Sequence, residues 1–352
     1  MLNKKQVGEI REHLNSSQNP IFFFDNDVDG LCSFLLLRRY SEKGKGVAIK
    51  SFPSLDLTHF KKVQELNSDY IFVLDRSLIS EEFFKEAEKF NIPIVCIDHH
   101  EIPKDISKFA GYYNPFFNKT KEESNVEPTT YLCYQVSQKK SDLWIAVTGC
   151  IADKFLPEFY KEFKKEYFEL SIDSKDAFEI RYKSQIGKIL KILSFALKDR
   201  TTNVVTMMKF LVNSKAPYEV LEENNQNATM HRRFREIDLK YERLIKKAEE
   251  IYKIQKNSEK LFFFKYGGDL SISSELSDEL SFKFPKKIIV VAYDSGIKVN
   301  ISVRGKGVKD LISKAIEGFE NATSGGHEDA VGGRIRTEDI GKFIRRLKDI
   351  IN

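Results

Sequence analysis

Short, continuous apolar runs alternate with longer amphipathic segments in the first part of the chain. Residues 20–24, 46–52, 70–74 and 92–97 are rich in β-branched and aromatic side chains, and polar or turn residues bound each run. Segment 80–90 has helical spacing and begins with a serine suited to cap a helix. Buried strands that alternate with helices predict a parallel β-sheet covered on both faces, with right-handed crossovers.

From about residue 155 to 256, strand-like runs become sparse and helical spacing dominates. Residues 186–198 and 236–256 have apolar positions three and four apart, and the second segment carries charges of alternating sign. This pattern predicts a helical region that ends in a long connecting helix. The basic cluster at 231–235 has two interpretations, a solvated helix face or an edge that faces nucleic acid.

Strand-like runs return after residue 257. Residues 261–266, 287–293 and 298–303 predict strands, and Gly296 indicates a tight hairpin between the last two. The elements expected after them are a helix, a glycine-rich loop and a basic C-terminal helix, at 308–319, 323–334 and 338–350. We therefore predict an α/β protein with a parallel-sheet domain, a helical connector and a smaller α/β domain, over residues 1–160, 161–256 and 257–352.

Composition narrows the class of protein without deciding its function. The 352 residues are 41% hydrophobic, which excludes a disordered chain, and the four cysteines form no CxxC pair, so we expect buried, reduced thiols. The net charge of +5 permits a nucleic-acid partner without requiring one. No run reaches the roughly 18 apolar residues of a membrane helix, and the N-terminus lacks the apolar core of a secretory signal. We expect a cytoplasmic protein with no membrane partner.

Acidic and histidine side chains gather at the predicted strand ends. They are Asp25, Asp27 and Asp29 after the first run, Asp75 after the third, Asp98, His99 and His100 after the fourth, and Asp153 after an apolar segment that could be a buried helix. The carboxyl ends of parallel strands share one edge of a sheet, where ligands bind in such folds. Clustered carboxylates repel one another unless a cation neutralises them. Mixed aspartate and histidine ligands suit manganese, zinc or iron better than calcium.

Each motif taken alone also has an ordinary explanation. Residues 25–30 could form a turn or half of a calcium loop, and Asp75 could be a turn residue at a strand end. Two histidines after an aspartate at the end of a buried strand are harder to explain by packing. In this order and context the motifs together predict a metal site.

The second chemical signal is the segment 324–334, which combines four glycines with His327. Glycines let a backbone approach a phosphate, and successive N–H groups can bind an anion. The alternative is a long hairpin loop with a surface histidine. The segment is neither a Walker loop nor a GxGxxG motif.

In combination these residues resemble a known family. DNDVDG (25–30), Asp75, IDHH (97–100) and GCIADKF (149–155) resemble the four motifs of DHH phosphoesterases, and SGGHEDAVGG (324–333) resembles the glycine–histidine motif of their DHH-associated C-terminal domain. The acidic first motif is most similar to that of RecJ-like nucleases, and the chain length is similar to that of compact archaeal RecJ-like proteins. The helical region carries almost none of the resemblance.

The resemblance implies a role for each matching residue. One manganese ion would be bound by Asp25, Asp27 and Asp153, a second by Asp29 and His99, and Asp75 would bridge the two. His100 would face the scissile phosphate, and Asp98 would orient the histidines. In the C-terminal domain, His327, Gly325 and Gly326 would contact the substrate, and Arg304 would hold a phosphate.

The activity that the resemblance implies is hydrolysis of single-stranded DNA or RNA from an end, by a two-metal mechanism in the cleft between the domains. Manganese is the expected ion, and magnesium and iron fit the same ligands. Replication or repair proteins are candidate partners. Two alternatives stay open: a phosphodiesterase for very short substrates, such as nanoRNA, phosphoadenosine phosphate or cyclic dinucleotides, and a non-catalytic replisome scaffold.

Two positions depart from the family pattern. Ser324 stands where the family often has a glycine. Arg76 follows Asp75 where a small or neutral polar residue is more usual. Its guanidinium could contact phosphate or pair with an acidic residue.

Overall fold

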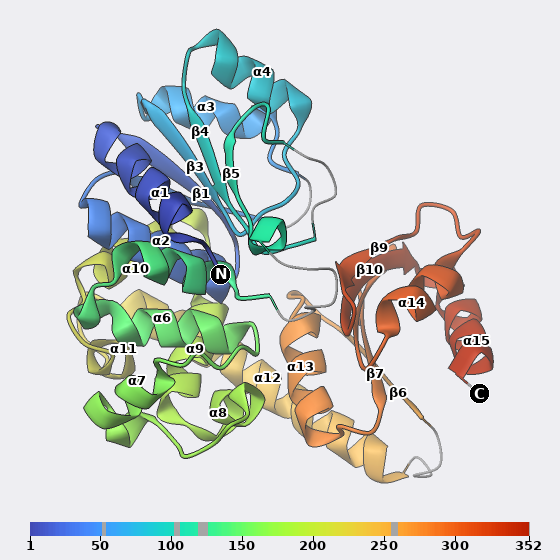
Figure 1. The fold of residues 1–352 in the computed structure, drawn as a ribbon. Helices are drawn as coiled ribbons and strands as arrows, with labels where there is room; N and C mark the ends of the chain where they lie inside the picture. Colours follow the sequence, from blue (N-terminus) through green and yellow to red (C-terminus); the bar gives the residue numbers. More distant parts are fainter. Residues whose placement is uncertain (51–53, 102–105, 119–125, 255–259, 352) are drawn as a thin grey trace. The chain divides into compact units, whose positions relative to one another are not determined.

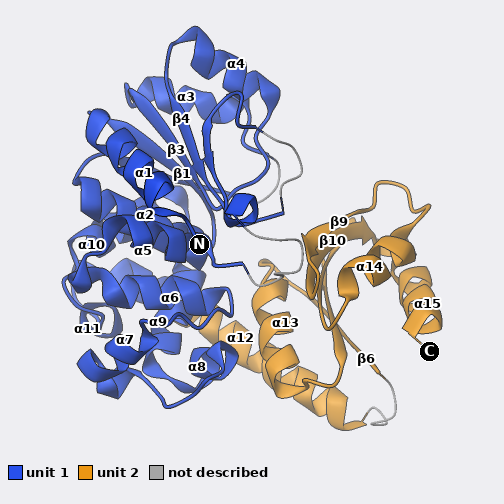
Figure 2. Cartoon of the chain, in the orientation of Figure 1, with its two compact units in different colours: residues 1–234 blue, residues 235–352 orange. Residues whose placement is uncertain are grey.

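The computed structural model describes residues 1–50, 54–101, 106–118, 126–254 and 260–351 (Figure 1). The chain divides into two compact units, unit 1 (residues 1–234) and unit 2 (residues 235–352), coloured blue and orange in Figure 2. The helices of the predicted middle region, up to residue 234, belong to unit 1. The bounds predicted at 160 and 256 follow changes in sequence pattern, and they stay predictions.

Unit 1 contains a five-stranded parallel sheet with the strand order β2-β1-β3-β4-β5. Its strands are β1 (Pro20–Asp25), β2 (Lys45–Ile49), β3 (Tyr70–Leu74), β4 (Ile94–Ile97) and β5 (Gly111–Tyr113). The predicted parallel sheet is confirmed, with all four predicted runs as strands and β5 in addition. Residues 51 and 52 of the second predicted run lie outside the described residues.

Helices cover both faces of this sheet (Figure 1). The helices of unit 1 are α1 (Lys4–Ser16), α2 (Val28–Ser41), α3 (Leu57–Glu65), α4 (Glu81–Lys89), α5 (Thr129–Ser137), α6 (Leu143–Ala152), α7 (Tyr160–Glu166), α8 (Ala177–Lys183), α9 (Gln185–Ala196), α10 (Thr201–Asn213) and α11 (Tyr218–Leu221), with 3₁₀ turns at Pro115–Asn118, Lys140–Asp142 and Phe168–Leu170. Helices α7, α8 and α11 pack on other helices of this unit. Helix α4 begins as predicted, because the Ser80 side chain accepts a hydrogen bond from the Phe83 N–H.

The apolar residues of β1 supply two separate cores. Phe22 and Phe24 join the larger core, to which helices α2, α5, α6 and α9 also contribute. Ile21 and Phe23 point to the other face and pack with residues of α3 and α4. Successive side chains of a strand alternate between faces, so a strand covered on both sides is apolar throughout.

Unit 2 contains a mixed sheet with the strand order β6-β7-β8-β10-β9, in which β6 and β7 are parallel and the other pairs antiparallel. The strands are β6 (Leu261–Gly267), β7 (Ile288–Asp294), β8 (Lys298–Arg304), β9 (Thr323–His327) and β10 (Ala330–Arg336). The helices are α13 (Ser273–Lys283), α14 (Val308–Ile316) and α15 (Ile340–Ile351), with a 3₁₀ turn at Thr337–Asp339. The boundary between the units falls within α12 (Ala228–Ile254). Residues 255 and 256 of the predicted connecting helix lie outside the described residues.

The glycine-rich segment 323–334 was predicted as a loop, and that prediction was wrong. It forms the hairpin β9–β10, in which Gly326 pairs with Val331 and β10 pairs on its other side with β8. Gly326 has φ +143°, and an added Cβ would lie 2.2 Å from the carbonyl oxygen of Ala330. Glycine is poorly suited to strands in general, but at this position any side chain would strain the hairpin.

All four cysteines are buried free thiols, as expected from their spacing. Within the ranges that the structure describes, no helix combines the length and the apolar character that crossing a bilayer requires.

Candidate metal centre

Five of the predicted acidic and histidine residues of unit 1 lie where three neighbouring strands end. Asp25 is the last residue of β1, Asp75 follows β3, and Asp98, His99 and His100 follow β4. Strands β1, β3 and β4 are adjacent and parallel, so their carboxyl ends meet at the same edge of the sheet.

Four of the predicted residues form what we call the acid–histidine cluster: Asp29 in the first turn of α2, Asp75 after β3, His99 after β4 and Asp153 at the end of α6. The Nε2 atom of His99 lies 3.3 Å from Asp75 Oδ1, 3.3 Å from Asp153 Oδ2 and 3.7 Å from Asp29 Oδ2. Two ligands that each lie about 2.1 Å from one ion are separated by about 3–4 Å. One ligand atom from each of Asp29, His99 and Asp153 lies within 4.8 Å of the other two, a spacing that fits a divalent cation, and the mixture of carboxylate and imidazole suits manganese, zinc or iron.

The N-terminus of α5 holds two members of this cluster. Asp29 is buried, and its two carboxylate oxygens accept hydrogen bonds from the N–H groups of Thr129 (3.0 Å) and Thr130 (2.7 Å). The Thr129 hydroxyl donates to Asp75 Oδ1 at 3.1 Å. N–H groups at the start of a helix stabilise carboxylates. Neither threonine is among the residues predicted from the sequence, where the available signal was a threonine pair directly after Pro128 at the start of a helical pattern.

The DNDVDG motif places its aspartates by joining β1 tightly to α2. Asp27 caps α2, with its Oδ1 accepting a hydrogen bond from the Gly30 N–H at 2.9 Å, and Asp29 lies in the first turn. A Cβ on Gly30 would lie 2.4 Å from the carbonyl oxygen of Asp25. Glycine at this position lets the helix begin close to the strand, and this brings the carboxylates together.

Burial and mutual repulsion make this cluster unfavourable without a cation. Asp27, next to this cluster, is partly exposed to solvent. The protein atoms around its carboxylate still remove much of its hydration, and this desolvation, with repulsion from Asp25 and Asp153, raises the pKa of Asp27 to about 7. Burial and then neighbouring carboxylates raise the pKa of Asp29 and of Asp75 well above the ordinary value. A bound divalent ion would remove this repulsion.

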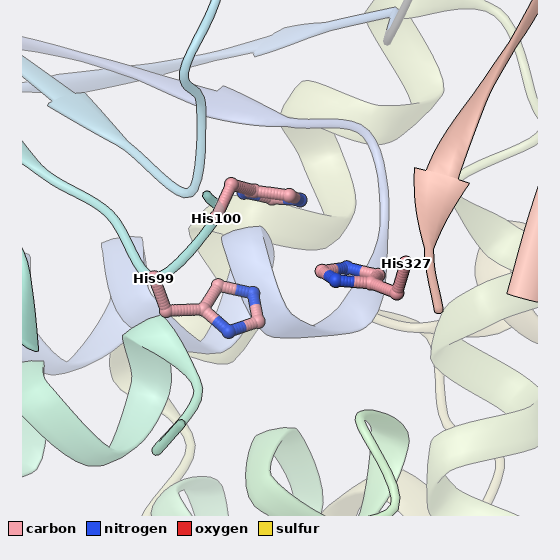
Figure 3. A group of neighbouring side chains, drawn as sticks. All are labelled: His99, His100 and His327. Atoms are coloured by element: carbon pink, nitrogen blue, oxygen red, sulfur yellow. The ribbon is translucent and has the colours of Figure 1, made fainter. Parts of the chain in front are cut away.

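Asp98, which is buried, and His100, whose side chain is 32% exposed, form a pair beside the acid–histidine cluster. The Nδ1 of His100 and Asp98 Oδ1 are 2.7 Å apart, and the Asn114 side chain donates to the carbonyl oxygen of His100. The rings of His99 and His100 leave the same loop, with centroids 4.7 Å apart (Figure 3). Burial opposes the charge of each partner. Even so, the hydrogen bond and attraction raise the pKa of His100 to about 9 and lower the pKa of Asp98. This geometry is the one that the predicted orienting role of Asp98 requires, and that role stays a prediction.

Arg76 pairs with an acidic residue, which was one of its two expected roles. Its Nη1 lies 3.1 Å from Asp25 Oδ1. The side chain of Arg76 is 4% exposed and that of Asp25 is 14% exposed, so the pair is largely shielded from water. The carboxylate of Asp25 is therefore already paired with a positively charged side chain of the same protein.

The predicted substrate residues of unit 2 lie on two different strands. Arg304 ends β8 and is buried, and its guanidinium donates to Asp278, Ser302 and Ser274 at 2.7–3.0 Å. The other three residues, Gly325, Gly326 and His327, lie on β9, an edge strand that is exposed along its whole length. His327 is also drawn in Figure 3. Contact of these residues with a substrate stays a prediction.

Two family models match the chain. The DHH family N-terminal domain matches residues 21–153, and the DHHA1 domain matches residues 258–352. The chain therefore belongs to the DHH phosphoesterase family and carries a DHHA1 domain, which confirms the resemblance inferred from its motifs.

Solved structures show that the fold is RecJ-like. RecJ from Thermus thermophilus in complex with Mn²⁺ has a TM-score of 0.69 at 13% identity, over 98% of this chain and 54% of that chain. An exonuclease RecJ bound to manganese has a TM-score of 0.65 at 13% identity, over 98% and 93% of the two chains. CDC45 from Entamoeba histolytica has a TM-score of 0.58 at 10% identity, over 99% of both chains. This chain thus spans about half of the Thermus protein. No curated protein matches the sequence.

Proposed function

We propose that this protein is a manganese-dependent exonuclease that hydrolyses phosphodiester bonds in single-stranded DNA or RNA, starting from an end. The observation that carries the proposal is the convergence of Asp29, Asp75, His99 and Asp153 at one sheet edge. This donor set has no simple structural purpose, because its buried carboxylates repel one another. Such a set suits an enzyme of the DHH family better than a scaffold.

The metal requirement follows from the ligands. Two manganese ions are the expected complement, bound by the acid–histidine cluster together with Asp25 and Asp27, and magnesium would fit the same oxygen ligands. Divalent ions in such a site lower the pKa of a bound water and stabilise charge on a phosphate. The RecJ structures with manganese share their fold with this chain, and this shared fold is what they add in support of manganese.

The residues of the chain would position and stabilise the reacting phosphate. Asp98 orients the His100 ring through Nδ1, and we assign the opposite edge of the ring to a non-bridging phosphate oxygen. The family resemblance assigns Asp75 to both ions, and the Thr129 hydroxyl would orient this carboxylate through Oδ1. Thr129 and Thr130 hold Asp29 and Asp75 in place by donating hydrogen bonds to them.

Unit 2 would hold the strand or its terminus. Within this unit, a Cβ on Gly325 would meet no described atom within 4 Å, so the internal packing does not require glycine there. Glycine does allow a backbone or phosphate to approach closely.

Exposed arginines at 232 and 235 would add phosphate contacts. Hydrolysis should therefore weaken as the salt concentration rises, with a log–log slope of about −0.7 for each phosphate contacted.

A substrate panel tests the proposal. End-labelled single strands of about 20–30 nucleotides, each blocked at neither, one or both ends, are incubated with the full chain and Mn²⁺. We expect mononucleotides to be released from one free end, and the annealed duplex and the doubly blocked strand to be protected. Asp153→Ala should abolish this release, whereas Asp173→Ala, which removes an exposed carboxylate elsewhere in unit 1, should not.

Other outcomes of the panel would replace the proposal. Internal fragments from the doubly blocked strand would indicate an endonuclease. Activity confined to oligonucleotides of about 2–5 residues, or to cyclic dinucleotides, would favour the short-substrate phosphodiesterase. Strand binding without hydrolysis under any divalent ion would favour a scaffold.

A further inference from the structure

The ion pair between Arg76 and Asp25 changes the net charge of the metal centre. Asp25 Oδ1 accepts hydrogen bonds from Arg76 Nη1 at 3.1 Å and from the Asn26 N–H at 3.0 Å. An arginine stays protonated at every accessible pH, so its positive charge is permanent. With 4% of the Arg76 side chain exposed, water screens this charge poorly.

The two expected metal positions differ in what already holds their carboxylates. Asp29 and Asp75 accept hydrogen bonds from uncharged donors, the N–H groups and hydroxyl at the start of α5. They also lie beside His99 Nε2, a nitrogen that can itself be a metal ligand. Asp25 is held by a full positive charge. An ion that binds Asp25 must displace or share the guanidinium and lie close to it, which costs electrostatic free energy.

We propose that Arg76 makes the metal centre asymmetric: the acid–histidine cluster binds one divalent ion tightly, and Arg76 keeps Asp25 from completing an equally tight second position. Arg76 is then a positioning residue that supplies a fixed positive charge beside the metal. The inference rests on the proposed metal-dependent function. Its test measures metal binding without any substrate, so a failure of the exonuclease proposal would not decide it.

Titration of the metal-free full chain with Mn²⁺, with free ion counted by electron paramagnetic resonance, tests the inference. We expect one tight equivalent per chain, and a second that binds at least about a hundredfold more weakly. Arg76→Gln should strengthen the second step by about the same factor. Arg76→Lys keeps the charge and should retain the parent pattern. Asp25→Asn should retain the tight equivalent.

Three results would overturn the inference. They are two equivalents of equal affinity in the parent chain, an Arg76→Gln pattern identical to the parent, and loss of the tight equivalent in Asp25→Asn. If Arg76→Gln fails to fold because Asp25 is left unpaired, the Asp25→Asn, Arg76→Gln double variant removes both charges. That variant should fold and keep one tight equivalent, and loss of this equivalent would also overturn the inference.

Discussion

Thr129 contributes to the metal centre without being a candidate ligand, since its hydroxyl donates to Asp75 and its N–H to Asp29. Thr129→Val removes the hydroxyl and keeps the shape and the backbone N–H. We expect manganese affinity to fall by about 10–100-fold, because Asp75 loses the donor that orients it. Thr129→Ser, which keeps the hydroxyl, should bind almost as the parent does. Unchanged affinity in Thr129→Val would show that Asp75 is oriented by other contacts.

His327 offers the clearest single-residue test of the substrate role of unit 2. It is exposed on β9, so His327→Ala should leave the melting temperature and manganese binding unchanged while it raises KM or lowers kcat. Steady-state kinetics on a labelled single strand measure this effect. Cleavage at the parent rate would mean that the β9 hairpin is merely structural.

Arg304 is a poorer probe of the same role because it also stabilises unit 2. Arg304→Ala would leave Asp278 buried without its cation, and breaking such a pair costs roughly 3–5 kcal/mol. A loss of activity in this variant would therefore combine unfolding with any loss of a phosphate contact.

At the scale of elements, the close packing of α5 on α6 sets the position of the cluster. A Cβ on Gly149 of α6 would lie 2.1 Å from the Thr130 hydroxyl of α5, and the Thr130 N–H holds Asp29. Gly149→Ala should therefore push the helices apart, lower the free energy of unfolding by about 1–3 kcal/mol and weaken manganese binding.

Gly8→Ala is the matched control for this prediction. Gly8 is also in a helix, α1, but a Cβ there would meet none of the described atoms within 4 Å. It should stabilise the chain slightly, by up to about 1 kcal/mol, and leave manganese binding unchanged. Thermal melting and manganese titration of both variants provide the comparison, and equal behaviour of the two would contradict the packing argument.

How far the sequence predicts these elements depends on whether local pattern or tertiary contact determines them. Strands β1, β3 and β4 are buried on both faces, so continuous apolar runs revealed them and located Asp75 and the histidines at their ends. The β9–β10 hairpin was not predicted from the sequence, because its glycines have low strand propensity. Its strands form through pairing of β10 with β9 and with β8. The partners of Arg76 and Thr129 lie 51 and 54 residues away, beyond any local pattern.

At the scale of the whole molecule, the repelling carboxylates link stability to pH and metal. Asp27, Asp29 and Asp75 have a pKa above the ordinary 3.8 in the metal-free fold, about 7 for Asp27. A raised pKa in the folded state means that stability is fully present below about pH 3.8 and is lost as pH rises through the folded value. Metal-free protein should therefore lose stability between about pH 4 and pH 7.

Manganese should restore this stability, and more so at higher pH, because the ligands must be deprotonated to bind. We expect the difference in melting temperature between manganese and chelator to grow from about pH 5 to pH 8. The Asp75→Asn, Asp153→Asn double variant should show little difference at any pH. A difference that shrinks as pH rises would contradict the assignment of these aspartates as metal ligands.

The most direct test of the central claim is the rate at which the full chain shortens an end-labelled single strand as Mn²⁺ is titrated, beside Asp75→Asn and the exposed control Asp173→Asn. We expect hydrolysis that requires the ion and stops with chelator. Asp75→Asn should lose several orders of magnitude in rate, and Asp173→Asn should keep the parent rate. Hydrolysis that persists in chelator, or an Asp75→Asn variant that cleaves at the parent rate, would contradict a metal-dependent exonuclease.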